Sequence, residues 1–252
     1  MALPYQEYGD KSAIFTCGGV SSWMWDNQIE YFTHYHCIVP DLPEHGLSNY
    51  EINFSIKGSA EEGIKLIEEK ASGKKVILIG FSLGSQVLIQ MLRMKPDLID
   101  FAIINSALVR PISDAKKWIE PSIRLSFPLI KNRWFSKLQA KTLNVSEDCF
   151  GKYYKESCQM KPDTLVRVLE ENMSFEIPKD FSEANGKILV TVGEREKAVM
   201  KKSAKDIVET NSNCIGVIIP EIGHGASLAM PEVFNQTWIH EGKVPKEYKV
   251  IS

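Results

Sequence analysis

The fold is decided by residues 76–94, which read VILIGFSLGSQVLIQMLRM. The first four residues are all apolar, as in a strand that is buried on both faces, and beyond residue 84 apolar residues recur at helical spacing. A strand therefore turns into a helix within five residues, and the glycines at 80 and 84 leave room for so tight a turn. Ser82 lies at its apex, near a helix N-terminus whose free N–H groups stabilise negative charge.

Residues 80–84, Gly-Phe-Ser-Leu-Gly, match the Gly-x-Ser-x-Gly pattern in the strand–turn–helix context that this pattern requires. The chain here resembles the α/β-hydrolases, in which such a turn presents the nucleophile. The resemblance follows the order of elements from about Ser12 to Trp238. It implies a mostly parallel sheet flanked by helices, with Ser82 as nucleophile. The alternative is a structural serine in a tight turn.

Composition indicates one large α/β unit with an ample core and room for a subdomain, since 44% of the 252 residues are apolar and 25% are charged. The net charge of -2 gives no reason to expect nucleic acid or an anionic membrane as partner. We expect a cytoplasmic protein without membrane insertion, because no apolar run reaches spanning length. Five cysteines without CxxC spacing disfavour a disulfide framework and a zinc site, and we expect no metal and no cofactor.

A second glycine turn follows the short apolar strand at 12–16 and reads Cys17-Gly18-Gly19-Val20. In the resembled family this turn usually reads His-Gly-x and supplies an oxyanion donor. The resemblance therefore implies that the backbone N–H of Gly19, or that of Val20, joins the N–H of Leu83. Cys17 stands where the family usually has histidine. The alternative is a plain strand-to-helix turn.

A third motif follows the predicted strand at 36–40. Residues 41–48, Asp-Leu-Pro-Glu-His-Gly-Leu-Ser, look like the family's D-x-P-G-H-G-x-S loop, with Glu44 in place of a glycine. We expect His45 to hold this loop rather than to take part in chemistry. The motif is typical of the fold and does not name a substrate.

A helical insertion is predicted between the strands at 101–104 and 187–192. A parallel crossover needs only a dozen or more residues, and roughly eighty lie in this interval. Helical patterns occur around 116–125, 134–143, 147–160 and 163–173. We interpret residues 111–184 as a helical cap, placed between the family's sixth- and seventh-strand equivalents, and residues 1–110 and 185–252 as the α/β-hydrolase core.

Large apolar residues near the turns and in the cap are candidates to contact a substrate. Each of them has packing against the core as its alternative role. The candidates are Val20, Trp23, Phe81, Trp118 and Trp134.

The predicted general base is His224, which comes five residues after the last buried strand at 214–219. In an open parallel sheet, groups that meet come from loops at the carboxyl ends of strands. His34 and His36 lie at the opposite edge, and His240 lies in the terminal helix. His45 is the remaining rival.

The predicted acid is Glu196. The resembled family has an aspartate three positions beyond a glycine at the end of the neighbouring strand, and Gly193 plus three is Glu196. The order Ser82, Glu196, His224 then matches the family's order. Glu194 is a competitor, and a family variant places the acid after the preceding strand, where this chain has Asn105.

These residues predict acyl transfer: a serine hydrolase that cleaves an ester or thioester of a small apolar molecule through an acyl-enzyme at Ser82. One alternative is an acyltransferase or a lyase that uses the same triad. The other is a ligand-binding protein without catalysis on the same scaffold. The sequence does not establish the oligomeric state.

Overall fold

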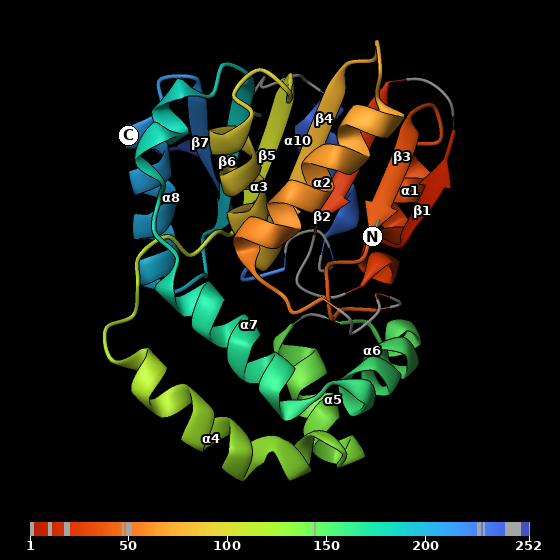
Figure 1. Cartoon of the computed structure of the whole chain (residues 1–252), viewed down its shortest axis with the longest axis vertical. Coiled ribbons are helices and arrows are strands. Elements are labelled where there is room, and N and C mark those ends of the chain that lie inside the picture. The colour runs from red at the N-terminus through yellow and green to blue at the C-terminus, as the bar shows by residue number, and fades with distance from the viewer. Residues whose placement is uncertain are drawn as a thin grey trace.

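Six parallel strands form the centre of one eight-stranded sheet with the order β1-β3-β2-β4-β5-β6-β7-β8 (Figure 1). The structure is a computed structural model that describes residues 3–9, 12–17, 21–46, 48, 52–143, 145–225, 228, 230–239 and 248–251. β1 pairs antiparallel with β3, and β8 pairs antiparallel with β7. The strands are β1 (Tyr5–Tyr8), β2 (Ala13–Cys17), β3 (His36–Pro40), β4 (Val76–Phe81), β5 (Phe101–Asn105), β6 (Lys187–Gly193), β7 (Cys214–Ile219) and β8 (Lys249–Val250).

Helices cover both faces of the sheet, with α2, α3 and α8 on one face and α1 and α10 on the other (Figure 1). Helix α2 (Ile56–Lys70) begins where the Ser55 hydroxyl accepts a hydrogen bond of 3.0 Å from the N–H of Gly58, which makes Ser55 its N-cap. The helical elements outside the segment from β5 through α7 (Pro162–Ser174) are η1 (Ser22–Trp25), α1 (Asp26–Tyr31), α2 (Ile56–Lys70), α3 (Leu83–Met94), η2 (Lys179–Glu183), α8 (Ala198–Thr210) and α10 (Pro231–Ile239).

The core explains why the central strands are apolar without alternation. Neighbouring strand residues point to opposite faces, so Leu78 packs with the α2 and α3 side and Ile79 with the other side, where Trp25 and Phe234 are fully buried. Helices cover both faces of the sheet, and consecutive residues of a central strand are therefore both buried. The predicted mostly parallel sheet flanked by helices is confirmed.

In the described part of the chain, four α-helices lie between β5 and β6 and gather at one end of the sheet (Figure 1). They are α4 (Ala115–Ile130), α5 (Arg133–Thr142), α6 (Glu147–Gln159) and α7 (Pro162–Ser174), and we call them the insertion. Each coincides with one of the helical patterns in the sequence, although α4 continues five residues further than its pattern. The division into a core of 1–110 and 185–252 and a cap of 111–184 stays a prediction.

The two edge strands were not predicted from the sequence. β1 and β8 are short and lack an apolar pattern, and the sequence after residue 238 reads only as a polar tail. Backbone pairing with β3 and β7 forms these strands, and such pairing is independent of side-chain pattern. The predicted polar tail therefore contains a short strand at residues 249–250 that the sequence pattern does not indicate.

Glu44, the residue that departs from the family loop, connects the loop after β3 to the insertion. Its backbone has φ +62°, a conformation in which glycine is unstrained. Its carboxylate is buried and accepts hydrogen bonds from the Thr164 hydroxyl at 2.8 Å, the Arg167 guanidinium at 2.9 Å and the N–H of Phe54 at 2.7 Å. Burial alone would raise the pKa of this carboxyl, but the three donors outweigh it and lower the pKa. The insertion therefore lies over the carboxyl ends of the strands.

We expect Arg167→Met to lower the free energy of unfolding by about 2 to 4 kcal/mol at pH 7, because a buried carboxylate loses its charged partner. Since folding lowers the pKa of Glu44, its contribution is present above the unfolded pKa of roughly 4.3 and is lost as pH falls through the folded pKa. The difference between variant and wild type should therefore shrink toward pH 3. Urea unfolding at several pH values measures it.

The matched control is Arg110→Met, which removes an ion pair with Asp206 at the exposed surface. Exposed pairs contribute little, so we expect a loss below about 1 kcal/mol. Equal losses in the two variants would contradict the role assigned to Glu44.

Candidate active site

The turn between β4 and α3 holds Ser82 in a strained backbone conformation, with φ +53° and ψ -114°. A Cβ atom on Gly80 would lie 2.6 Å from the Cα of Ser85, so only glycine fits before the turn. The N–H of Ser82 donates to the carbonyl of Asn105 at 2.9 Å, and the Ser85 hydroxyl donates to the same carbonyl at 2.8 Å. The turn is therefore fixed to the neighbouring strand β5.

The three residues predicted for the triad are joined in one hydrogen-bonded chain. His224 Nδ1 lies 3.0 Å from Glu196 Oε2, and His224 Nε2 lies 3.1 Å from Ser82 Oγ. Because an ionised carboxylate only accepts hydrogen bonds, Nδ1 carries the proton and Nε2 accepts the proton of the Ser82 hydroxyl. The three residues lie in loops that follow β4, β6 and β7. These loops are at the carboxyl ends of the parallel strands, where groups that meet are expected.

The Glu196 carboxylate is buried, with 2% of its side chain exposed, whereas one third of the His224 side chain is exposed. Its Oε1 accepts hydrogen bonds from the Ser106 hydroxyl at 2.6 Å and from the N–H of Gly193 at 3.0 Å. Burial alone would raise the pKa of this carboxyl. The hydrogen bonds that it accepts, that from His224 first among them, outweigh burial and hold the pKa below its ordinary value.

The residues at the other two candidate positions for the acid make other contacts. Glu194 accepts hydrogen bonds from Lys249 Nζ at 2.9 Å and from the N–H of Glu221 at 3.1 Å. The Asn105 amide donates to Thr191 Oγ1 at 2.7 Å. Of the carboxyl groups that the sequence proposed, the structure therefore brings only Glu196 to His224.

The rival histidine has the structural contact that we expected. His45 is buried and its Nδ1 donates to the carbonyl of Pro43 at 2.9 Å, which fixes the loop. Burial lowers the pKa of this imidazole and keeps it neutral. His36 lies at the start of β3, at the opposite edge of the sheet, and its Nε2 lies 2.7 Å from Glu7.

The predicted oxyanion donors are placed only in part. Leu83 is the first residue of α3, so its N–H has no partner within the helix and lies directly after Ser82. Gly19 and Val20 lie outside the described residues, as does the side chain of Cys17. A second donor from this turn stays a prediction.

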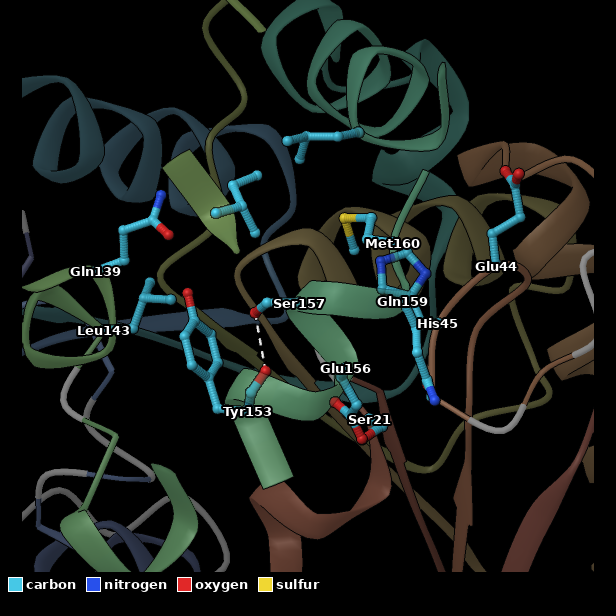
Figure 2. Close-up of a pocket in the computed structure, with 13 residues that line it drawn as sticks. Ser21, Glu44, His45, Gln139, Leu143, Tyr153, Glu156, Ser157, Gln159 and Met160 are labelled. Atoms are coloured by element: carbon cyan, nitrogen blue, oxygen red, sulfur yellow. Dashed lines mark hydrogen bonds between the residues drawn. The ribbon is translucent and has the colours of Figure 1, made fainter. Parts of the chain in front are cut away.

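A cavity of about 200 Å³ lies between the core loops and the insertion (Figure 2). Figure 2 shows Gln139 and Leu143 on one side and His45 and Glu44 on the other, with residues of α6 between them. The described residues that line it are Ser21, Glu44, His45, Gly46, Ile130, Gln139, Leu143, Tyr153, Glu156, Ser157, Gln159, Met160 and Leu165.

The described residues among those proposed for substrate binding do not line this cavity, and Val20 lies outside the described residues. Trp118 and Trp134 are 70% and 74% exposed, because they lie on outward faces of α4 and α5. Trp23 is buried in the core, and Phe81 is buried against His224 with ring centroids 5.0 Å apart. Helical spacing indicates which residues share a face, but it does not say which face is turned inward.

Two residues that sequence reasoning missed support the site. Ser106 donates to Glu196, and no motif distinguishes it from other serines. Glu156 of α6 accepts hydrogen bonds from the Ser21 hydroxyl and, at 2.9 Å, from Trp23 Nε1. Ser21 follows directly on the predicted oxyanion turn, so Glu156 connects the insertion to the segment that leaves this turn.

Two described thiols are poor nucleophiles, because burial raises the pKa of Cys37 to about 11 and that of Cys214 to about 12. Within the described ranges, no group of three His, Cys, Asp or Glu side chains is arranged to hold a metal ion. Nor does any helix in the described part of the chain have the length and apolarity to cross a membrane.

Comparison with known proteins extends these observations. A family model described as alpha/beta hydrolase fold matches residues 14–150, more than half of the chain. A search of curated proteins gives no match.

Among solved structures, a thermophilic esterase from Thermogutta terrifontis is 19% identical, with 95% of this chain and 93% of that chain covered and a TM-score of 0.74. MenH from S. aureus is 16% identical, with 95% and 97% covered and a TM-score of 0.75. The enol-lactonase from Burkholderia xenovorans LB400 is 12% identical, with 94% and 95% covered and a TM-score of 0.79. At these identities the likeness shows the fold.

We expect Gly80→Ala to lower the free energy of unfolding by about 1 to 3 kcal/mol, because the added methyl group meets backbone atoms of α3 that cannot move independently. The matched control is Gly151→Ala on α6, where an added Cβ meets nothing within 4 Å. That change should raise stability by about 0.5 to 1 kcal/mol. Urea unfolding of both variants tests the turn, and a Gly80→Ala protein as stable as wild type would contradict it.

Proposed function

The chain belongs to the alpha/beta hydrolase fold family, and from this premise we propose that it is a serine hydrolase that cleaves a carboxylic ester or thioester through an acyl-enzyme at Ser82. The observation that carries the proposal is the hydrogen-bonded chain from Glu196 through His224 to Ser82. A serine hydroxyl is a weak nucleophile at neutral pH, and an imidazole held in one tautomer is the base that activates it.

In the first half of the reaction, Ser82 Oγ attacks the carbonyl carbon while His224 Nε2 takes the hydroxyl proton. The carbonyl oxygen becomes an oxyanion, which the N–H of Leu83 and the predicted donor at Gly19 stabilise. The carbon–oxygen or carbon–sulfur bond to the leaving group then breaks. His224 returns the proton to the departing alcohol or thiol, and the acyl group stays on Ser82.

In the second half, a water molecule gives a proton to His224 and attacks the acyl carbon. The ester bond to Ser82 breaks, the proton returns to Ser82 Oγ, and the carboxylic acid leaves. Glu196 stays ionised throughout, because its lowered pKa disfavours protonation, and its negative charge stabilises the imidazolium that forms twice in each cycle.

The cavity between the core loops and the insertion supports a small, uncharged substrate group. Its described lining includes the carboxylates Glu44 and Glu156 and no lysine or arginine. Glu44 is already paired with Arg167, so a negatively charged group there would chiefly meet the like charge of Glu156. We therefore propose that the insertion acts as a cap and that this cavity takes the part of the substrate remote from the reacting bond.

We also propose a cytoplasmic location. The odd number of cysteines without CxxC spacing supports it.

Treatment with a fluorophosphonate should add one phosphonyl group to Ser82, detected by mass spectrometry, and p-nitrophenyl butyrate should be hydrolysed. We expect Ser82→Ala and His224→Ala to lower kcat/KM by about 10⁴-fold or more, and Glu196→Gln to lower kcat by about 10³- to 10⁴-fold. The matched control is His34→Ala at an exposed position, with unchanged turnover.

No labelling and no turnover across aryl esters of varied acyl length would contradict the hydrolase and favour a ligand-binding protein on this scaffold. Labelling with transfer of the acyl group to an added alcohol in preference to water would favour an acyltransferase.

A pair of esters of similar length tests the character of the cavity. We expect kcat/KM for p-nitrophenyl butyrate to exceed that for the mono-p-nitrophenyl ester of succinic acid by about tenfold, because the second substrate ends in a carboxylate that would face Glu156. Glu156→Gln should reduce this ratio several-fold. Glu147→Gln, an exposed change on the same helix outside the cavity, should leave it unchanged, and a preference for the succinate ester in wild type would contradict the proposal.

A further inference from the structure

Helix α4 is apolar on two sides. Its inner side, with Ile119 buried, packs against α7. Trp118, Leu125 and Leu129 are spaced seven and four residues apart and so share a second side of the helix. Their side chains are 70%, 85% and 48% exposed. An amphipathic surface helix ordinarily turns polar residues to solvent, so this outer side has the character of a contact surface.

Exposed apolar side chains also occur on α5. Trp134 and Leu138 are one helical turn apart and are 74% and 52% exposed. α4 and α5 are in contact and lie at the end of the molecule away from the sheet (Figure 1). We call Trp118, Leu125, Leu129, Trp134 and Leu138 the exposed apolar face.

The charge around this face differs from that of the whole chain. Residues 114–142 contain seven lysines and arginines and two acidic residues, although the chain as a whole has a net charge of -2. Lys117 pairs with Asp114, and Arg124 pairs with Glu120 and Asp163. Within the described part of the chain, the remaining five basic side chains form no ion pair. They are Lys116, Lys131, Arg133, Lys137 and Lys141.

Three of these cations border a hollow between α5 and the start of α6. Arg133, Lys137 and Lys141 follow one another at four-residue spacing on α5 and line a cavity of about 770 Å³ together with Phe150. The charged groups of Arg133 and Lys137 lie 5.5 Å and 5.6 Å from the centre of the Phe150 ring. Glu147 is the one acidic residue in the described lining. The hollow therefore offers cations to an anionic group, with an aromatic ring at its base.

We propose that α4 and α5 dock on the surface of an anionic lipid bilayer. Helices with protruding Trp and Leu side chains beside Lys and Arg lie in the interface between headgroups and acyl chains, where the apolar side chains are buried and the cations meet lipid phosphates. The protein lies on such a surface and does not span it. Docking is independent of the reaction at Ser82, and it turns the insertion toward the lipid.

A second copy of this chain fits the face less well. A symmetric dimer would place the same patch on both partners and so would gather two sets of five unpaired cations in one interface. Like charges in an interface oppose association. An anionic lipid surface satisfies both the apolar side chains and the cations.

Flotation of the purified chain with vesicles tests the proposal. We expect binding to vesicles of phosphatidylcholine with 30% phosphatidylglycerol at 50 mM salt, weak binding to phosphatidylcholine alone, and a marked loss of binding at 500 mM salt. Lys131→Glu with Lys141→Glu should lower the partition coefficient at least tenfold. Trp118→Ser with Leu125→Ser should lower it about tenfold or more.

Matched controls change the same chemistry elsewhere. Lys75→Glu with Lys187→Glu reverses two exposed charges at the opposite end of the strands, and Ile215→Ser removes an apolar side chain that is 45% exposed on β7. Both controls should bind as wild type, and circular dichroism checks that all variants fold. Absence of binding to anionic vesicles, or equal losses in test and control variants, would overturn the proposal. A dimer that Trp118→Ser dissociates, without vesicle binding, would overturn it in favour of self-association.

Discussion

The buried carboxylate of Glu196 is the group on which the arrangement of the site depends. A charge in so dry a position is tolerated only when its oxygens are satisfied, and here three donors from β6, from the residue after β5 and from the loop after β7 converge on it. The same hydrogen bonds that keep it ionised also orient the imidazole. The orientation of His224, and with it the contact to Ser82, therefore follows from how one carboxylate is solvated by protein.

Carboxylates also join the insertion to the core. Glu44 of the loop after β3 accepts hydrogen bonds from α7, and Glu156 of α6 accepts hydrogen bonds from the segment that follows β2. Both carboxylates line the cavity between them, Glu44 as the partner of Arg167 and Glu156 as the acceptor for Ser21 and Trp23. One set of interactions thus positions the helices above the strand ends and supplies polar groups to the space below them.

Charge along the chain is uneven in a way that the total conceals. A net charge of -2 argues against an anionic partner for the chain as an average. The helices farthest from the sheet nevertheless carry a surplus of cations beside outward-facing tryptophans, and the opposing acidic residues lie elsewhere. A partner contacts one face of the protein, so the charge of that face matters for binding more than the net charge of the chain.

The sequence by itself determined the elements and their order, because buried parallel strands and amphipathic helices have apolar patterns with different periods and because the turn at 80–84 admits few residue types. It also indicated Ser82, His224 and Glu196, since each follows a predicted strand. Only the tertiary structure decided that Glu196 and not Glu194 faces the imidazole, that Ser106 supports it, that β1 and β8 exist, and that Trp118 and Trp134 face outward. Those features depend on contacts between segments far apart in the chain. A local sequence pattern does not specify which distant residues a side chain contacts.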